Sequence, residues 1–397
     1  MSRHQGHMDH VMLPCVLGLV ELCNILVYSA AGVRAADVYG QEHYYLTRQI
    51  LFAALGLGVM VVASRIPYQM YKRWTYPLLG VVMLLLIGVF IPGIGSTMGG
   101  ATRWISFKYF YLQPSELAKF ALVLYLAYSL TKKQDHIGTF AIGILPNLRF
   151  SGVALALILM EPDFGTTAVL AAILFAMMFV AGTRIVHLSG IFAVAAPLAF
   201  VVLIGAEYRR RRLLAFLDPW ADQADTGFHI IQSWLAFHRG GIFGVGLGAG
   251  TQKLFYLPAA HTDFIFRVVG EELGLLGVLA TIAAFGLFIA RGTSVARRAP
   301  DLFGQLLGTG ITFIIGLQAV INMMVVTGLL PTKGLTLPFV SYGGSSLVAY
   351  LFMVGVLLNI SSQALVENRR VRGGGRNAPR RRWSPFGGRS ESRREDP

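Results

Sequence analysis

Long apolar runs separated by short polar segments dominate the chain. Ten of them read as helices that cross a bilayer, whose hydrocarbon core takes about 20 helical residues. They lie near 11–32, 46–64, 75–93, 116–130, 148–160, 165–182, 185–206, 273–290, 305–328 and 344–362. The pattern predicts an all-α polytopic membrane protein with ten transmembrane helices. The run at 148–160 is the shortest, and if it is a re-entrant piece the C-terminal tail changes sides.

The composition agrees with this pattern. Of the 397 residues 55% are hydrophobic and only 14% are charged, whereas soluble domains carry about 25% charged residues. This composition excludes a disordered chain, a disulfide scaffold and a collagen-like repeat. The two cysteines, Cys15 and Cys23, both fall in the first apolar run without metal or disulfide spacing, so we expect buried thiols.

The distribution of basic residues predicts the orientation. The net charge is +14, and the stretch 367–397 alone holds ten Arg. With both termini inside, the other inner segments hold 11 Lys and Arg against 4 in the short outer loops, as the positive-inside rule requires. A basic chain can bind nucleic acid, but here orientation and attraction to anionic membrane lipid explain the charge, so no nucleic-acid partner is expected.

These patterns divide the chain into three parts. Residues 1–10 are predicted to be a cytoplasmic N-terminus, 11–365 a ten-helix membrane domain, and 366–397 a disordered Arg-rich cytoplasmic tail. The segment 207–272, between the seventh and eighth helices, is predicted to be a large extracytoplasmic loop. Long loops inside a compact domain usually carry function.

Charged residues gather at the predicted outer end of the fourth helix. Glu116 and Lys119 are three residues apart and share one helix face. They either form a structural ion pair at the interface or line a cavity. Pro114 suits a helix start, with Ser115 as a nearby N-cap. Just upstream, Arg103 is either an interfacial anchor or a phosphate-binding cation.

Two further outer segments combine polar residues with Pro and Gly. In EPDFGT (161–166) we favour Asp163 as a helix N-cap over a role for Glu161 and Asp163 in acid/base chemistry or cation binding. The segment 330–346 contains two prolines, Lys333 and adjacent glycines. It is predicted to be a re-entrant loop with backbone amides free for an anion, the alternative being an exposed turn.

Asp263 is the strongest candidate for a general base. It lies where the polar part of 207–272 meets an apolar segment, and partial desolvation there would raise its pKa towards the working range of a base. His261 lies two residues before it, and we interpret His261 as a surface residue. Arg267 lies four residues after Asp263 and could pair with it.

Taken together, these motifs are similar to those of one family, the SEDS proteins (shape, elongation, division and sporulation). The resemblance covers about residues 10–365, and within the family the sequence is more similar to the division-associated members than to the elongation-associated ones. The motifs that carry it are GATRW (100–104), QPSELAK (113–119), EPDFGT (161–166), DPW (218–220), TGFHIIQS (226–233), LPAAHTDFIF (257–266), EELG (271–274) and LPTKGLTLPFVSYGGSS (330–346).

The resemblance implies a peptidoglycan glycosyltransferase of the bacterial inner membrane, active at the division septum. Such an enzyme joins lipid II units into glycan strands outside the membrane, with undecaprenyl diphosphate as leaving group. It implies that Asp263 is the catalytic base, that Glu116 and Lys119 belong to a polar cavity, and that Arg103 is the arginine of the family's GxxRW motif. Lys333, Ser341 and Gly343 complete the candidate residues for binding substrate or diphosphate. Glu161 departs from the family, which frequently has Gln before Pro-Asp.

The resemblance also implies partners and a cofactor. We expect a divalent cation (Mg²⁺ or Mn²⁺), a class B penicillin-binding transpeptidase and other divisome proteins, besides lipid II and membrane lipid. Three alternatives stay open: a lipid II flippase or other transporter, for which Glu21 and Asn24 in the first helix are the best signal, an elongation-type polymerase, and a scaffold without chemistry.

Overall fold

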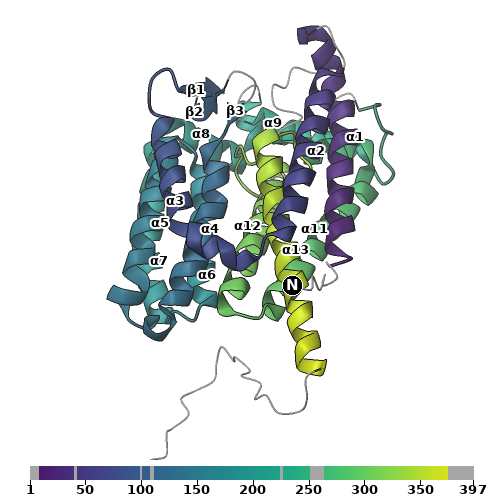
Figure 1. Ribbon diagram of the computed structural model, residues 1–397. Coiled ribbons are helices and arrows are strands. Elements are labelled where there is room, and N and C mark those ends of the chain that lie inside the picture. The colour runs from purple at the N-terminus through teal and green to yellow at the C-terminus, as the bar shows by residue number, and fades with distance from the viewer. Residues whose placement is uncertain are drawn as a thin grey trace, which may run out of the picture.

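The computed structural model describes residues 9–39, 43–98, 101–107, 111–223, 227–250 and 263–373. Long helices stand side by side in one bundle (Figure 1). A small β-sheet and the short helices α8 and α9 lie at one end of the bundle, and the start of α1 and the end of α13 lie at the other (Figure 1). We call the end with the sheet the loop end.

Every apolar run predicted from the sequence corresponds to a helix. These helices are α1 (Met12–Tyr39), α2 (Tyr44–Arg65), α3 (Tyr71–Gly88), α4 (Pro114–Lys132), α5 (Leu145–Met160), α6 (Phe164–Val180), α7 (Ile185–Gly205), α11 (Gly274–Arg298), α12 (Leu302–Val326) and α13 (Gly344–Gly373). Among the described residues, seven helical segments are long and apolar enough to cross a membrane. Helices α3, α4 and α6 are not among the seven, so ten crossings stay a prediction.

The shortest predicted run becomes a full-length segment in the structure. A turn of π-helix, η3 (Phe140–Ile144), precedes α5, and the combined segment Phe140–Met160 has 21 residues. Its length equals that of α7, which is ample for a crossing. The sequence pattern missed the first part because Pro146, Asn147 and Arg149 interrupt the apolar run.

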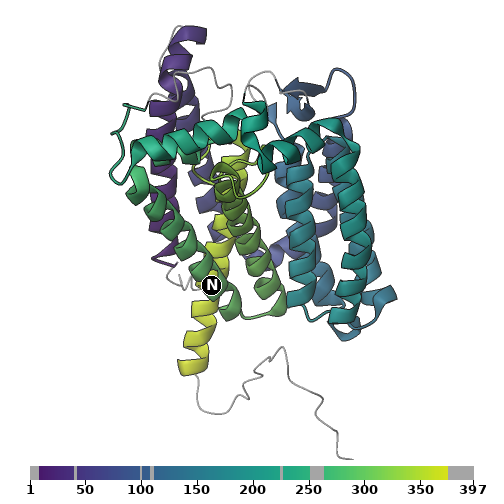
Figure 2. The same cartoon turned by 180° about the vertical axis from the view of Figure 1, so that it is seen from behind.

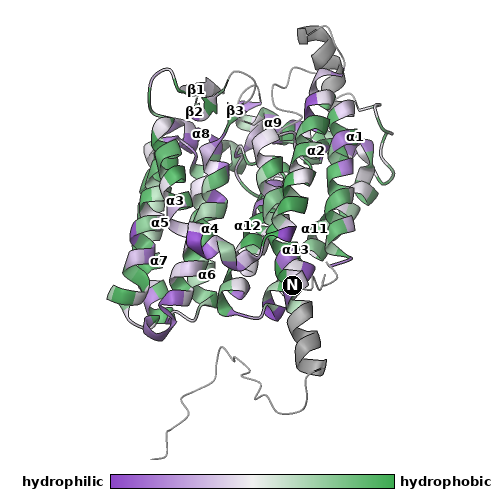
Figure 3. Ribbon diagram, viewed as in Figure 1, coloured by the Kyte–Doolittle hydropathy of each residue, from purple (hydrophilic) through white to green (hydrophobic). Residues whose placement is uncertain are grey.

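The centre of the bundle is formed by α4, α12 and α13. Buried residues make up 67% of the apolar window of α12 and 78% of that of α13, whereas α7 has none. Gly355 allows α13 to pack closely on α2, because a side chain at this position would collide with the backbone carbonyl of Met60 on α2. Apolar residues cover the middle of the bundle and polar ones gather towards its ends (Figure 3), which is the surface that a lipid bilayer requires.

The described part of 207–272, the segment predicted as a large extracytoplasmic loop, is largely helical, and its side of the membrane stays a prediction. It contains α8 (Glu207–Leu217), the 3₁₀ turn η4 (Pro219–Asp222), α9 (Phe228–Gly240) and α10 (Ile265–Glu272). Helix α9 lies across the end of the bundle (Figure 2) and buries Ile230, Ile231 and Ala236. The apolar positions of α9 recur at helical spacing, but they are too few to stand out beside the membrane helices.

A three-stranded antiparallel sheet at the loop end was not predicted. Strands β1 (Gly95–Met98), β2 (Ala101–Ser106) and β3 (Tyr111–Leu112) pair in the order β1-β2-β3. Ala101 and Ile105 are buried and form the inner face of β2. The strands are too short for their alternation to be recognised in sequence, yet β2 is what positions Arg103.

At the opposite end, ion pairs connect the termini of the helices. Lys72 binds Asp301 at 3.0 Å and Arg291 binds Asp9 at 2.6 Å. Asp301 also caps α12 by accepting a hydrogen bond from the amide of Gly304. Helix α13 continues to Gly373, so the backbone of 366–373, predicted as disordered tail, is helical. Residues 1–8 and 374–397 lie outside the described residues.

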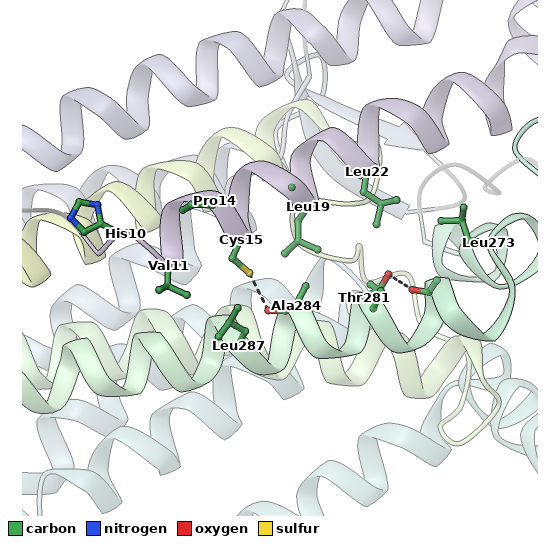
Figure 4. Close-up of a pocket in the computed structure, with 13 residues that line it drawn as sticks. His10, Val11, Pro14, Cys15, Leu19, Leu22, Leu273, Thr281, Ala284 and Leu287 are labelled. Carbon is green, nitrogen blue, oxygen red and sulfur yellow. Dashed lines mark hydrogen bonds between the residues drawn. The ribbon is translucent and has the colours of Figure 1, made fainter. Parts of the chain in front are cut away.

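A groove of about 680 Å³ opens between α1 and α11 (Figure 4). The thiol of Cys15 donates a hydrogen bond to the carbonyl of Ala284 at 3.2 Å, and Thr281 donates to the carbonyl of its own helix at Gly277. Both cysteines are free, as predicted, but only Cys23 is buried as expected, since Cys15 is half-buried. None of the candidate catalytic or binding residues lines this groove.

Candidate active site

Asp263 lies two residues before the start of α10 at the loop end, where three chain segments meet. Asn322 of α12 donates one hydrogen bond to the backbone carbonyl of Asp263 (2.9 Å) and one to that of Leu335 (2.5 Å). A Cβ atom at Gly334 would lie 3.1 Å from a carboxylate oxygen of Asp263. The segment 331–337 therefore passes directly along the candidate base, and Gly334 leaves room for the carboxylate.

The surroundings of Asp263 suit a general base. Burial raises the pKa of Asp263 to about 6, and the negative charge of Asp163 adds to this rise. The positive charges of Arg103 and Arg212 oppose it. A carboxyl group with this pKa is ionised at neutral pH but holds a proton more strongly than a free aspartate, as the sequence predicted.

Arg103 connects the sheet to the turn between α5 and α6. Its guanidinium donates hydrogen bonds to the backbone carbonyls of Glu161 (3.1 Å) and Pro162 (2.6 Å). In the same turn Asp163 accepts hydrogen bonds from the amide (3.0 Å) and hydroxyl (2.9 Å) of Thr166. The prediction that Asp163 caps the following helix is confirmed.

Further cations face the same turn. The ammonium of Lys333 lies 4.9 Å from the centre of the Phe164 ring, and the guanidinium of Arg209 lies 6.0 Å from it. Burial lowers the pKa of Lys333, and the charge of Asp163 opposes this change. Arg103, Arg212 and Lys333 thus form a group of basic residues close to the carboxylates of Asp163 and Asp263.

Glu116 and Lys119 form the ion pair that their spacing predicts, but deep in the protein. Their side chains lie 2.7 Å apart, and Lys119 is completely buried. The Lys119 ammonium also donates hydrogen bonds to Gln318 (2.7 Å) and to the hydroxyl of Tyr350 (2.9 Å). Gln318 in turn donates to the backbone carbonyl of Thr336 at 2.9 Å. The pair is thereby connected to segment 331–337.

The capping prediction for Ser115 is wrong. Gln113 is the residue that precedes the first turn of α4, Pro114 is its first residue, and the hydroxyl of Ser115 is buried without a partner among the described residues. Pro114 lacks an amide hydrogen and suits this first position. It starts the helix two residues too early for Ser115 to act as cap.

The segment 330–346 is not an exposed turn, since every residue of it except Gly334 is buried or half-buried. The hydroxyl of Ser341 accepts a hydrogen bond from the amide of Leu337 (2.8 Å), and the carbonyl of Gly343 accepts one from Ser346 (3.2 Å). Phe339 has a φ of 65°, a backbone conformation that costs a phenylalanine about 1–3 kcal/mol. Ser341 and Gly343 therefore hold the shape of the loop, and their predicted contact with substrate stays a prediction.

The predicted pairing of Arg267 with Asp263 is wrong. Arg267 is buried, its guanidinium lies 5.7 Å from the centre of the Phe264 ring, and the charge acting on it is that of Glu271. Burial lowers the pKa of Arg267 to about 10, and Glu271 opposes this change. Helix α10 begins at Ile265, so Asp263 lies outside the helical geometry that would bring the two together. His261 lies outside the described residues.

Several residues of the site were not found from the sequence. Gln318 and Asn322 are isolated polar residues in the apolar run of α12, and Tyr350 belongs to α13. Arg212, on α8, belongs to a run of four arginines in which nothing marks one as special. His229 stacks on Phe264 at 4.9 Å. Gln318 and Asn322 could have been found from the sequence, because polar residues inside membrane helices usually serve a function.

A metal centre built by the protein alone is not present in the described part of the chain. Within residues 9–39, 43–98, 101–107, 111–223, 227–250 and 263–373, no group of three or more His, Cys, Asp and Glu side chains could hold a metal ion. The described residues therefore do not fit a divalent cation held by protein ligands alone.

Comparison with known sequences gives a consistent result. Residues 9–365 match the model of the FtsW/RodA/SpoVE family, described as a cell cycle protein. The "Probable peptidoglycan glycosyltransferase FtsW" of Geobacter metallireducens is 49% identical over 355 residues, which are 89% of this chain and 95% of that protein. The protein of the same name from Coxiella burnetii is 42% identical, over 89% of this chain and 96% of its own.

Solved structures agree with the sequences. A chain from a study of how "a peptidoglycan synthase complex" coordinates polymerization and crosslinking superposes with a TM-score of 0.74, 30% identity and coverage of 90% of this chain and 98% of that one. The rod shape determining protein RodA of Thermus thermophilus superposes with a TM-score of 0.66 and 30% identity, over 89% and 96% of the two chains.

Proposed function

This chain belongs to the FtsW/RodA/SpoVE family of cell cycle proteins, and on that basis we propose that it is a peptidoglycan glycosyltransferase. In this proposal it polymerises lipid II into glycan strands during septal cell-wall synthesis. The observation that carries the proposal is the half-buried Asp263, whose raised pKa reflects desolvation and on which the charges of Arg103 and Arg212 act. The similarity to FtsW proteins over nearly the whole membrane domain supports the reaction class.

Asp263 acts as the general base in the proposed reaction. Its carboxylate takes the proton from the acceptor sugar hydroxyl, and the resulting oxygen attacks the anomeric carbon of the donor. The new glycosidic bond forms as the bond from the anomeric carbon to the diphosphate oxygen breaks, with inversion. The pKa of about 6 supports this role. At neutral pH the carboxylate is ionised before the reaction, yet it is basic enough to take the proton of the acceptor hydroxyl.

The basic residues stabilise the leaving undecaprenyl diphosphate. Negative charge develops on the departing oxygen, and preorganised cations in a water-poor site lower the barrier to its departure. Arg103 and Arg212 act electrostatically on Asp263, and Lys333 faces the same turn. A guanidinium can bind two phosphate oxygens at once. We assign diphosphate binding to these three residues.

Glu116 and Lys119 have a different role in this proposal. They are buried and connect through Gln318 to the carbonyl of Thr336. We propose that they position segment 331–337 beside Asp263. Loss of this pair would then disturb the reaction through the loop, without any direct contact between Lys119 and the substrate.

The divalent cation remains part of the proposal only as a companion of the substrate diphosphate. Magnesium sites of this kind use few protein carboxylates and are completed by substrate phosphates and water. Such an ion would supply additional positive charge to the leaving group. No step assigned to the residues above depends on it.

A class B penicillin-binding transpeptidase is the proposed partner. The support is the superposition on a chain from a complex that couples polymerization to crosslinking. We place the protein in the inner membrane with its loop end outside, where both lipid II and the transpeptidase domain are accessible. Other divisome proteins are expected partners at the septum.

The transporter alternative rested on Glu21 and Asn24 in α1. In the structure Asn24 donates a hydrogen bond to Glu21 at 3.5 Å, and Glu21 is exposed on the surface of the helix. A carrier needs its polar residues around a central site near the bilayer midplane. The polar network here instead leads from Lys119 to the loop end, which favours the polymerase.

The test of the proposal is glycan polymerisation by the purified protein in lipid nanodiscs, supplied with lipid II alone or with the transpeptidase partner. We expect glycan strands in at least one of the two conditions. A parallel assay follows the movement of fluorescent lipid II across vesicle membranes that contain the protein. Rapid movement without any polymer in either condition would overturn the glycosyltransferase in favour of the transporter.

A further inference from the structure

The carboxyl group of Glu161 is placed unusually for an acidic residue. It directly follows α5 at the loop end, in the turn that leads to α6, and its exposed fraction is 0%. Neither of its carboxyl oxygens has a hydrogen-bond partner among the described residues. The backbone carbonyl of the same residue accepts a hydrogen bond from Arg103, so the guanidinium contacts the main chain and leaves the acid group unpaired.

An unpaired carboxylate in such a position is unfavourable, because burying an isolated charge costs far more than burying a neutral group. Buried acids therefore tend to hold their proton. Burial raises the pKa of Glu161 to about 8, and the charge of Asp163 adds to the rise while that of Arg103 opposes it. Below about pH 8 the group is consequently a neutral acid.

The ionisable groups around this turn come from five segments. They are Arg103 on β2, Asp163 in the turn itself, Tyr208, Arg209 and Arg212 on α8, Lys333 in the loop before α13, and Asp263 before α10. Arg103 and Asp163 act electrostatically on both Glu161 and Asp263. Of these two, only Arg103 is attracted by an ionised Glu161, because Asp163 has the same sign.

We propose that Glu161 is a positioning residue whose proton controls the availability of Arg103. As a neutral acid it leaves the guanidinium to Asp263 and the substrate diphosphate. As a carboxylate it draws the guanidinium towards itself and away from the reacting groups. The effect on turnover rests on the proposed glycosyltransferase activity, whereas the protonation of Glu161 does not.

The kinetic test compares pH profiles of lipid II polymerisation for the wild type and Glu161→Gln, in which the amide imitates the neutral acid. For the wild type we expect the rate to fall about tenfold per pH unit above about pH 8, since one proton is lost from Glu161. In Glu161→Gln this alkaline limb should disappear. An alkaline limb with the same midpoint in both proteins would overturn the proposal.

Glu207→Gln is the matched control for this experiment. Glu207 lies on α8 at the same end of the protein, and its exposed side chain pairs with Arg211 at 2.7 Å. The substitution makes the same change from carboxyl to amide at an acid that is exposed to solvent and paired with a cation. The profile of this variant should coincide with that of the wild type, including its alkaline limb.

A second measurement needs no turnover. Infrared spectroscopy detects the carbonyl stretch of a protonated carboxylic acid, and the difference between wild type and Glu161→Gln isolates that of Glu161. We expect the band at neutral pH, with a loss centred at about pH 8. Its absence at neutral pH overturns the proposal even if no variant polymerises lipid II. If Glu161→Gln does not fold, a wild-type titration without a transition near pH 8 has the same consequence.

Discussion

Asn322 holds the backbone of Asp263 by a hydrogen bond of 2.9 Å from its side-chain amide to the Asp263 carbonyl. The second hydrogen of the same amide binds the carbonyl of Leu335 at 2.5 Å. Asn322 belongs to the central helix α12 and is 1% exposed. One residue of the bundle core thus fixes the distance between the candidate base and the loop that passes beside it.

Replacing this residue tests whether the connection matters for the reaction. Asn322→Leu removes the donor from the buried carbonyl of Leu335, which costs about 1–3 kcal/mol, and from the half-buried carbonyl of Asp263. A displacement of the base by about 1 Å can reduce a rate about 100-fold. We expect a loss of that order in polymerisation per folded protein, measured with lipid II, together with a lower melting temperature in detergent.

Asn147→Leu provides the control for Asn322→Leu. Asn147 is completely buried near the start of α5, at the end of the bundle away from the site, and donates to the carbonyl of Gly143 at 2.7 Å. The substitution should lower the melting temperature with little change in the rate per folded protein. Equal losses of rate in both variants would mean that Asn322 contributes only stability.

Asp263→Asn tests the base itself. The amide has nearly the same shape as the carboxylate but cannot accept the acceptor proton, and loss of a general base costs about 10²–10⁴-fold in rate. We expect a well-folded protein with polymer yield reduced by that factor. Asp218→Asn, at an exposed aspartate that accepts a hydrogen bond from the amide of Trp220, should remain active. Full yield from Asp263→Asn contradicts the assignment.

The sequence predicts the parts of the site that depend on neighbours along the chain. The pairing of Glu116 with Lys119 and the capping by Asp163 each involve residues three positions apart, and both are confirmed. The helices are predicted correctly for the same reason, because an apolar run is also a property of neighbouring residues. The wrong predictions, Ser115 as cap and Arg267 as partner of Asp263, assumed a helix boundary that the structure places two residues away.

The remaining parts depend on contacts between distant segments. Lys119 meets Gln318 and Tyr350 across 199 and 231 positions, and Asn322 meets Asp263 across 59. A polar residue in an apolar helix signals a buried contact but does not identify its partner. The strands that position Arg103 and the burial of Glu161 also arise from packing between distant segments. The spacing of apolar residues along the chain does not reveal such packing.

The acid side of the pH profile should report on Asp263. Burial raises its pKa to about 6, so the base is protonated below that pH and polymerisation should fall there. Arg103 lowers this pKa and Asp163 raises it. Arg103→Gln should therefore move the acid limb to higher pH, and Asp163→Asn should move it to lower pH.

The opposite signs of these two shifts make the test specific. Both variants are expected to reduce the maximal rate, so the midpoint of the limb and not the rate is the quantity to compare. Arg65→Gln, in the last turn of α2 at the other end of the bundle, should leave the midpoint unchanged. Shifts of the same sign in Arg103→Gln and Asp163→Asn would show that the limb does not belong to Asp263.

The buried pair of Glu116 and Lys119 should be most sensitive to removal of one partner. Removing one member of a buried ion pair leaves the other charge uncompensated and costs about 3–5 kcal/mol. Lys119→Met also removes the hydrogen bonds to Gln318 and Tyr350. We expect a large fall in melting temperature for Lys119→Met and a smaller one for Glu116→Gln, which is neutral and keeps its shape.

The double variant Lys119→Met/Glu116→Gln distinguishes the charge balance of the pair from its role in positioning segment 331–337. Because it contains no unpaired charge, its stability should exceed that of Lys119→Met alone, and the double-mutant cycle should give a coupling of about 1–3 kcal/mol. Its polymerisation should nevertheless stay low, since Gln318 and the carbonyl of Thr336 lose the ammonium that orders them. Recovery of both stability and activity would show that each residue of the pair only compensates the charge of the other and does not position the segment.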